Sequence, residues 1–121
     1  MSAFEDIEAI GPLRVWNDVV AREVHGEQST LAVVELAPGA VVPEHHHANE
    51  QLGLVIRGTV EFRVGAETKE LAPGATWRIP GDVPHEVRAG PEGAVVVDVF
   101  APARADWGAL ERNAPSAPAW P

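Results

Sequence analysis

Short runs of β-branched and aromatic residues, each closed by glycine or proline, follow one another along most of this chain. The runs recur about every ten residues, and eleven glycines and eleven prolines are available to form the turns between them. No helical pattern separates the runs, and only residues 107–112 are expected to form a short helical turn. We therefore expect an all-β sandwich or small barrel, with strands at residues 19–25, 30–36, 51–57, 60–64, 68–71, 76–79, 85–89 and 94–100.

The overall composition narrows the possible partners and compartments. At 121 residues, with 45% hydrophobic and 22% charged residues, the chain is expected to form one globular domain. Its net charge of −9 repels polyanions, so nucleic acid is not an expected partner, although a few arginines in a pocket could still hold a small acidic ligand. The acidic N-terminus has no apolar segment like that of a signal peptide, and no run is long enough to cross a bilayer. We expect a cytoplasmic protein without a membrane partner.

The chain has no cysteine, so disulfides, thiolate zinc sites and iron–sulfur clusters are excluded. Any metal must be bound by imidazole, carboxylate, amide or water. Imidazole ligands suit zinc, nickel, manganese, iron and copper, and the sequence does not choose among these divalent transition metals.

The histidines cluster in a way that favours such a site. Three are consecutive, His45 to His47, and they lie in a stretch that is expected to be a strand. Because side chains alternate along a strand, His45 and His47 would share one face, and His46 would point away. Gln51, four residues further on, and the distant His85 would complete a set of four metal ligands: His45, His47, Gln51 and His85. Four protein ligands leave one or two coordination positions open, which is typical of catalysis or ligand capture. The alternative is a polar surface patch.

The spacing of these residues resembles the two motifs of the cupin family. Gly39, five residues, the histidine run, three residues, Gln51, six residues and Gly58 resemble the first motif. Gly74, five residues, then Pro80-Gly81-Asp82, two residues and His85 resemble the second. The resemblance implies a single antiparallel jelly-roll domain over residues 1–121, with its barrel at about 30–100, N-terminal strands within 4–25 and a C-terminal tail at 105–121. It also implies a homodimer, with residues 4–16 as a candidate contact.

Three positions depart from the family pattern. Gln51 stands where glutamate is usual, Asp82 replaces a glycine, and Ala89 replaces an asparagine. With Gln51 in the set, all four ligands are neutral before metal binding. The full charge of a divalent cation would then remain available to polarise an acidic ligand.

A second set of candidate residues follows near the C-terminus. Asp98 interrupts an apolar strand, and a buried carboxylate needs either a partner or a function. The segment DVFAPARADW, together with Asn49-Glu50-Gln51, resembles a subset of small cupins that includes pectin-degradation proteins acting on unsaturated uronates. The resemblance implies that Asp98 transfers a proton, that Arg104 binds a substrate carboxylate and that Phe100 is an apolar wall. The alternative for Asp98 and Arg104 is a structural ion pair that closes the end of the barrel.

The leading functional hypothesis is therefore a metal-dependent enzyme, with isomerase or lyase-type chemistry on a small acidic substrate derived from a sugar, such as an unsaturated uronate. A metal-dependent dioxygenase is one alternative. A non-catalytic cupin that binds or senses a small molecule is the other.

Overall fold

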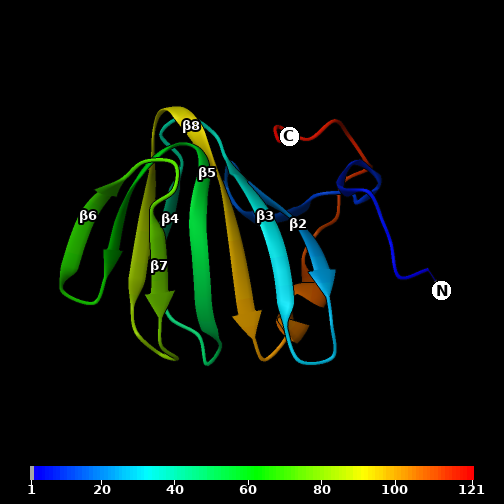
Figure 1. Ribbon diagram of the computed structural model, residues 1–121, viewed down its shortest axis with the longest axis horizontal. Helices are drawn as coiled ribbons and strands as arrows, with labels where there is room; N and C mark the ends of the chain where they lie inside the picture. Colours follow the sequence, from blue (N-terminus) through cyan, green and yellow to red (C-terminus); the bar gives the residue numbers. More distant parts are fainter. Residues whose placement is uncertain (1) are drawn as a thin grey trace.

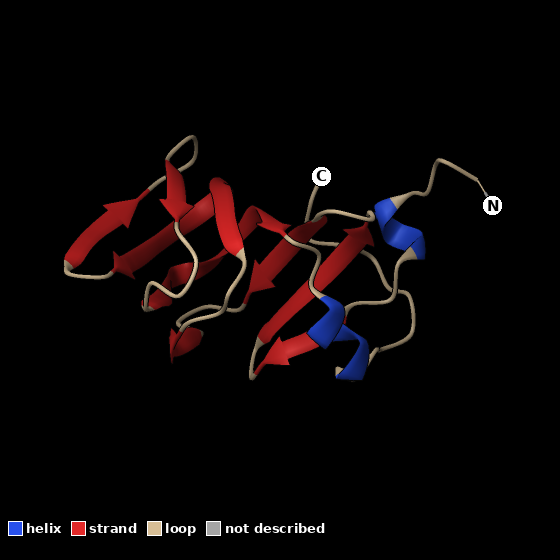
Figure 2. Cartoon of the chain, turned by 90° about the horizontal axis from the view of Figure 1, so that it is seen from below, coloured by secondary structure: helices blue, strands red, loops and turns tan. Residues whose placement is uncertain are grey.

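The computed structural model describes residues 2–121, and its strands are all paired antiparallel. The eight strands, shown in Figure 1, are β1 (Leu13–Trp16), β2 (Val19–His25), β3 (Thr30–Leu36), β4 (Val41–His45), β5 (Glu50–Val64), β6 (Glu67–Leu71), β7 (Thr76–Ile79) and β8 (His85–Ala101). Two 3-10 turns, η1 (Ile7–Ala9) and η2 (Ala105–Ala109), lie on the side of the molecule formed by β1 to β3, away from β6 (Figure 2). The expected all-β class is confirmed.

Two long strands, β5 and β8, pair along their whole lengths and bend together, so that one hydrogen-bonded sheet forms two layers. In the first layer, β1, β2 and β3 continue from the C-terminal half of β8, and β7 pairs with the N-terminal half of β5. In the second layer, β4 pairs with the N-terminal half of β8, and β6 pairs with the C-terminal half of β5. This arrangement is the antiparallel jelly roll that the sequence led us to expect.

The predicted breaks within β5 and β8 are wrong. We expected strands to end at Gly58 and at Gly90, but at both places the strand bends and continues. The register between β5 and β8 shifts between Gly58 and Val60, where Gly58 has a φ of +74°. A Cβ at Gly58 would lie 2.9 Å from the Cα of Ala94, so only glycine allows the two strands to approach here. Glycine inside a strand therefore marks a bulge in this chain.

Two strands are shorter than the segments in which they were expected: β1 lies within residues 4–25, and β4 ends at His45, the first residue of the histidine run. Strand β1 is short and irregular, with a register shift between Arg14 and Trp16. Strand β4 contains Pro43, which removes one backbone donor and weakened the strand pattern. The N-terminal strands, expected within residues 4–25, begin only at Leu13, and the segment before β1 contains η1 instead. The 3-10 turn η2 replaces the helical turn expected at residues 107–112.

The core lies between the two layers and follows the alternation of the strands. On β8, Ala94, Val96, Asp98 and Phe100 are all buried and point inward. The ring centroids of Phe62 and Trp77, from β5 and β7, lie 4.8 Å apart in the same interior. An aspartate thus occupies an inward position among apolar residues, and it needs hydrogen-bond donors there.

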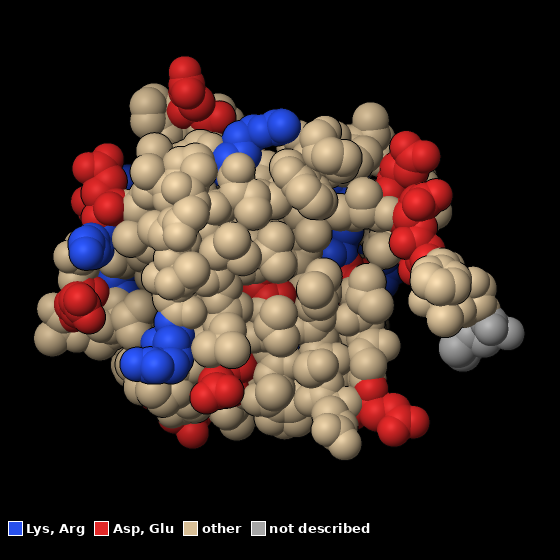
Figure 3. Space-filling model, viewed as in Figure 1, with Lys and Arg blue, Asp and Glu red and all other residues tan. Residues whose placement is uncertain are grey.

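The outward face of the first layer is largely apolar. The register places Val24, Leu31, Val99 and Leu52 in one row across β2, β3, β8 and β5. Three of these side chains are substantially exposed, at 52% for Val24 and 42% for Leu31 and Leu52. Figure 3 shows this face as mostly uncharged, with most of its acidic side chains toward the margins. No helix among residues 2–121 is both long and apolar enough to cross a membrane.

Candidate metal centre

Three of the expected ligands come together at one end of the two layers. One ring nitrogen from each of His45, His47 and His85 lies within 4.8 Å of the other two. His45 is the last residue of β4 and is paired in register with His85, the first residue of β8. The expectation that the whole histidine run lies on a strand is wrong, because β4 ends at His45. His46 nevertheless points away as expected: its side chain is 63% exposed and lies 3.5 Å from a carboxylate oxygen of Asp82.

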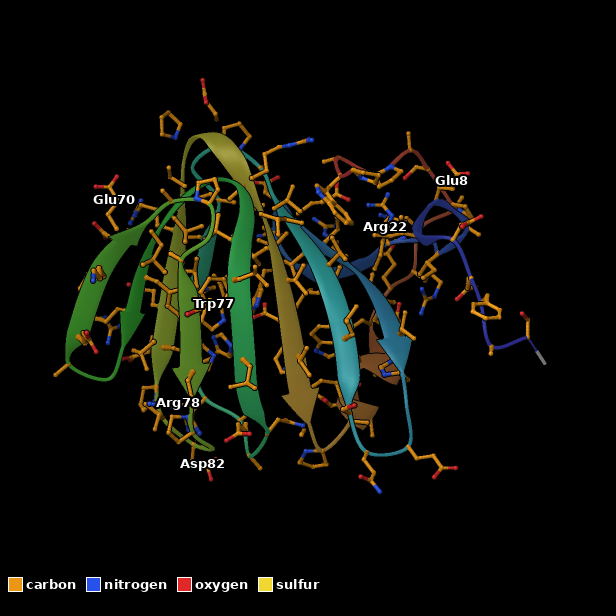
Figure 4. The ribbon with its side chains drawn as sticks, in the orientation of Figure 1. Glu8, Arg22, Glu70, Trp77, Arg78 and Asp82 are labelled. Atoms are coloured by element: carbon orange, nitrogen blue, oxygen red, sulfur yellow. The ribbon has the colours of Figure 1, made fainter. Side chains whose placement is uncertain are left out.

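A backbone hydrogen bond ties the two halves of the site together. The N–H of Asp82 donates to the carbonyl oxygen of His47 at 2.7 Å, and it thereby joins the loop before β8 to the loop after β4. Asp82 has a φ of +63°, in the left-handed region that glycine adopts freely and that aspartate tolerates better than most residues. The tolerance of aspartate for this conformation explains why it can replace the glycine of the family motif. Figure 4 shows Asp82 in this loop, below β7.

The three imidazoles are held in the same tautomer. The Nδ1 atoms of His45, His47 and His85 lie 2.8, 3.0 and 2.9 Å from the carbonyl oxygens of Pro43, Asn49 and Val83, respectively. Because a carbonyl oxygen only accepts, each Nδ1 must carry the proton and donate it. Each Nε2 is therefore left with a free lone pair, which is the arrangement that metal-binding histidines usually show.

Gln51 contributes an oxygen to the same point. Its Nε2 donates to Oδ1 of Asp98 at 2.9 Å, which fixes the orientation of the amide. Its Oε1 then lies 3.1 Å from Nε2 of His47. Both of these atoms are acceptors when His47 is neutral, and two facing lone pairs are unfavourable unless a cation lies between them. The Nε2 of His85 is also buried without a hydrogen-bond partner. The residues present therefore fit a metal ion bound by three imidazoles and one amide oxygen.

Burial keeps these histidines neutral. Desolvation is the main cause that lowers the pKa of His45 and of His47, and it lowers the pKa of His85 to about 4. At neutral pH, protons therefore compete little with a metal ion for the three Nε2 atoms.

Asp98 lies directly behind Gln51. Its Oδ1 accepts hydrogen bonds from Nε2 of Gln51 and from Nε1 of Trp77, both at 2.9 Å. Gly53 makes the second bond possible, because it lies on β5 between Trp77 on β7 and Asp98 on β8. A Cβ at Gly53 would lie 2.5 Å from both Oδ1 of Asp98 and Nε1 of Trp77. Figure 4 shows Trp77 on β7, beside β5.

The environment of Asp98 perturbs its acidity. Burial raises the pKa of its carboxyl group from 3.8 to about 6, although the hydrogen bonds from Gln51 and Trp77 and the charge of Arg104 oppose this rise. No hydrogen bond to Oδ2 is found within residues 2–121. Since the Asp98 side chain lines a cavity between the two layers, Oδ2 is the oxygen available to a ligand.

Phe100 and Arg104 lie near His47 and Gln51, and Phe100 is paired in register with Gln51. The Phe100 ring is buried, with its centroid 5.7 Å from that of His47. The Arg104 guanidinium lies over the Phe100 ring, with its central carbon 4.8 Å from the ring centroid. Arg104 makes its ion pair with Asp106, at 2.9 Å, and within residues 2–121 no ion pair joins it to Asp98. The structural ion pair that we considered for Asp98 and Arg104 is therefore not formed.

A small cavity of about 90 Å³ lies between the layers at this end of the barrel. The expected site residues in its wall are His45, Gln51, His85, Asp98, Phe100 and Arg104. His47 adjoins it through its contacts with Gln51 and Phe100. Sequence reasoning missed part of the wall. Trp16, whose ring centroid lies 5.3 Å from that of His45, and Trp107 also line the cavity. The sequence did contain a signal for Trp107, because it follows Arg104 closely within the segment DVFAPARADW.

Comparisons with known proteins agree with this architecture. A family model described as a cupin domain matches residues 32–100. The chain is 31% identical over 78 residues to the pectin degradation protein KdgF of Dickeya dadantii, a match that covers 64% of this chain and 71% of that protein. It is 28% identical over 79 residues to the dimethylsulfoniopropionate lyase DddW of Ruegeria pomeroyi, a match that covers 64% of this chain but only 52% of the lyase. The solved structure of KdgF from a Halomonas species superposes with a TM-score of 0.80 at 25% identity, over 88% of this chain and 98% of that one.

Proposed function

This chain belongs to the cupin family, and on that basis we propose that it is a metal-dependent enzyme that isomerises a small, sugar-derived carboxylate. The observation that carries the proposal is the convergence of two sets of residues on one cavity. The neutral ligand set and the buried carboxyl group of Asp98 share the amide of Gln51, and Arg104 lines the same wall. A positive group, a proton-transfer group and a metal ligand set in one small cavity are what an acid–base reaction on a carboxylate requires.

The resemblance to KdgF gives the proposed substrate class. Two proteins of that name match this chain, and one of them is described as a pectin degradation protein. The proposed substrate is therefore an unsaturated uronate, and the reaction opens its ring to a keto acid. This is an isomerisation: the ring carbon–oxygen bond breaks, the anomeric hydroxyl loses a proton, and the carbon–carbon double bond gains one. No atoms are gained or lost, and no oxidant is needed.

Each residue has a proposed role in this reaction. A divalent metal bound by His45, His47, His85 and Gln51 would supply Lewis-acid polarisation of a substrate oxygen. Asp98, whose pKa is raised to about 6, can both accept and release a proton, and it moves protons at Oδ2.

Arg104 binds the substrate carboxylate, because its planar guanidinium can donate two parallel hydrogen bonds. Phe100 and the nearby tryptophans limit the access of water to the cavity.

The test is turnover of unsaturated galacturonate by the metal-loaded protein. Asp98→Asn and Arg104→Ala are each expected to lower kcat/KM by at least about 100-fold with metal content retained. Glu70→Gln, an exposed change on β6, is the matched control and should keep full turnover. Full turnover in both site variants would contradict the proposal. An oxygen electrode separates the dioxygenase alternative, because the isomerisation consumes no dioxygen.

A second candidate is elimination from a small carboxylate, which the match to DddW supports. In that reaction Asp98 would remove a proton beside the carboxylate while the carbon–sulfur bond breaks, so that dimethylsulfoniopropionate yields dimethyl sulfide and acrylate. Release of dimethyl sulfide by the metal-loaded protein would favour this candidate over the isomerase. The absence of release, together with turnover of the uronate, would eliminate it.

We also propose a homodimer, as expected from the family resemblance. Within the expected contact region, residues 4–16, Phe4 is 89% exposed, whereas Trp16 lines the cavity. Light scattering should give the mass of two chains, and the mass of one chain would contradict the proposal.

A further inference from the structure

Arg104 is held more firmly than an arginine near the surface usually is. Its Nε donates to Oδ1 of Asp106 at 3.0 Å and its Nη2 donates to Oδ2 at 2.9 Å, so the two planar groups meet through two parallel hydrogen bonds. The rings of Phe100 and Trp107 also pack against the guanidinium, with centroids 4.8 and 4.9 Å from its central carbon. The backbone N–H of Arg104 donates to Oγ1 of the fully buried Thr30 at 2.9 Å.

This arrangement differs from the ordinary surface pairs of the same protein. The Arg104 side chain is only 11% exposed, although its partner Asp106 is 64% exposed. In the pair between Arg63 and Glu44, by contrast, the side chains are 33% and 56% exposed and meet through one nitrogen. Fixing the long side chain of an arginine in one conformation costs conformational entropy. A single solvent-exposed ion pair does not offset that cost.

The orientation of the guanidinium decides which of its edges is open. A guanidinium offers two donor pairs, Nε with Nη2 and Nη1 with Nη2. Asp106 occupies the first pair, whereas Nη1 of Arg104 donates no hydrogen bond within residues 2–121. Since Arg104 also lines the cavity beside His45 and Asp98, the second pair is the one that a cavity ligand can use.

We propose that Asp106 is a positioning residue that fixes Arg104 with its Nη1 and Nη2 atoms available to a ligand carboxylate, and that its charge offsets that of Arg104. This inference rests on the proposed function, because it assigns the geometry of carboxylate binding in the same site. One consequence concerns specificity. With Arg104 offset by Asp106, the bound metal is the main attraction for an anion, so the site favours carboxylates that reach both groups over anions that reach only one.

The test uses the zinc-loaded full chain, with acetate as a carboxylate probe. Asp106→Asn removes the carboxylate that offsets the charge of Arg104, and acetate, which would bind at the open edge of this guanidinium, should then bind about threefold more tightly. Glu70→Gln makes the same change in net charge on β6 and should leave acetate affinity unchanged. In Asp106→Asn combined with Arg104→Ala the gain should disappear, because the effect acts through Arg104. Unchanged or weaker binding in Asp106→Asn, or a gain that survives the loss of Arg104, would overturn the proposal.

Turnover gives a second measurement. On unsaturated galacturonate, Asp106→Asn should lower kcat at least tenfold without raising KM, because Arg104 loses its fixed orientation while the site becomes more attractive to anions. A merely structural role for Asp106 would raise KM and lower the melting temperature together, which would also overturn the proposal. If the wild-type protein does not convert the uronate, the proposed substrate is wrong, but the acetate comparison still decides the role of Asp106.

Discussion

The side chain of Gln51 donates a hydrogen bond to the buried carboxylate of Asp98 across 2.9 Å, from β5 to β8. The same amide presents its oxygen to His47, so the candidate metal ligand set and the candidate proton-transfer group share one side chain. A change in the charge of either group must therefore affect the other through this amide.

The first prediction concerns the stability of the metal-free protein with pH. The pKa of Asp98 is about 6 in the folded protein against an ordinary value of 3.8, so the folded state binds this proton more tightly than the unfolded chain. The contribution of Asp98 to the free energy of unfolding is greatest below about pH 4. It should fall by on the order of 3 kcal/mol as the pH rises from about 3 to about 7, through both pKa values. Asp98→Asn keeps an acceptor for Gln51 and Trp77 but cannot titrate.

Urea unfolding at several pH values checks this prediction. The difference in unfolding free energy between Asp98→Asn and the wild type should change by that amount across the interval, in favour of the variant at the higher pH. A difference that is independent of pH would show that Asp98 is not perturbed in the folded protein.

The second prediction concerns Gly53, which allows Trp77 to reach Asp98 across β5. Gly53→Ala places a Cβ 2.5 Å from both partners, so the indole must move and the hydrogen bond must break. We expect a loss of about 1–3 kcal/mol in unfolding free energy, as is usual for overpacking. Gly108→Ala is the matched control, because no atom lies within 4 Å of the added Cβ. The melting temperatures of Gly53→Ala and Gly108→Ala, measured side by side, test this expectation. Equal melting temperatures would contradict the prediction.

The third prediction separates the neighbouring histidines. His85→Ala removes a buried ligand whose Nε2 has no hydrogen-bond partner, and zinc affinity should fall by at least about 100-fold. His46→Ala changes an exposed side chain that points away from the site, and zinc affinity should stay within about twofold of the wild type. Competition with a zinc chelator measures both. Comparable losses in the two variants would show that the metal is bound elsewhere.

The fourth prediction concerns the buried acid Glu23, which lies outside the site. Arg112 donates to its two carboxylate oxygens at 3.1 and 2.5 Å and thereby ties the C-terminal segment to β2. Arg112→Ala should lower the free energy of unfolding by about 1–3 kcal/mol. This is less than for breaking a fully buried ion pair, because the Arg112 side chain is 47% exposed.

The unfolding free energy lost in Arg112→Ala should depend on pH. Burial opposes ionisation of Glu23, but the hydrogen bond from Arg112 and its charge outweigh burial, and the pKa of Glu23 is lowered. The stabilisation is therefore present above the ordinary value of 4.5 and disappears as the pH falls through the lower folded-state value. Chemical denaturation at neutral and acidic pH measures both effects, and an equal loss at both pH values would contradict the ionic origin.

The sequence predicted the fold well where turns and strands follow local rules. Strands β2, β3 and β7 begin and end at the expected residues, because proline or glycine turns bound them closely. Strands β5 and β8 were each divided in two, because a glycine at a bulge and a glycine at a turn look the same without the partner strand.

The candidate site was predictable to a similar extent. Alternation and motif spacing indicated His45, His47 and His85, and the structure brings them together. The pairing of Arg104 with Asp106 was not foreseen, since which acid an arginine contacts depends on how the chain turns after β8.

The two-layered path of β5 and β8 has a consequence for cooperativity. His45 and His85 belong to the layer of β4, whereas Gln51 belongs to the layer of β7. An ion bound by all of them would join the two layers directly, in addition to the core contacts between them and the shared strands β5 and β8. Metal binding would then slow the exchange of backbone amide hydrogens throughout both layers rather than only near the ligands. The metal ion proposed for the reaction would then also hold the two layers of the barrel together.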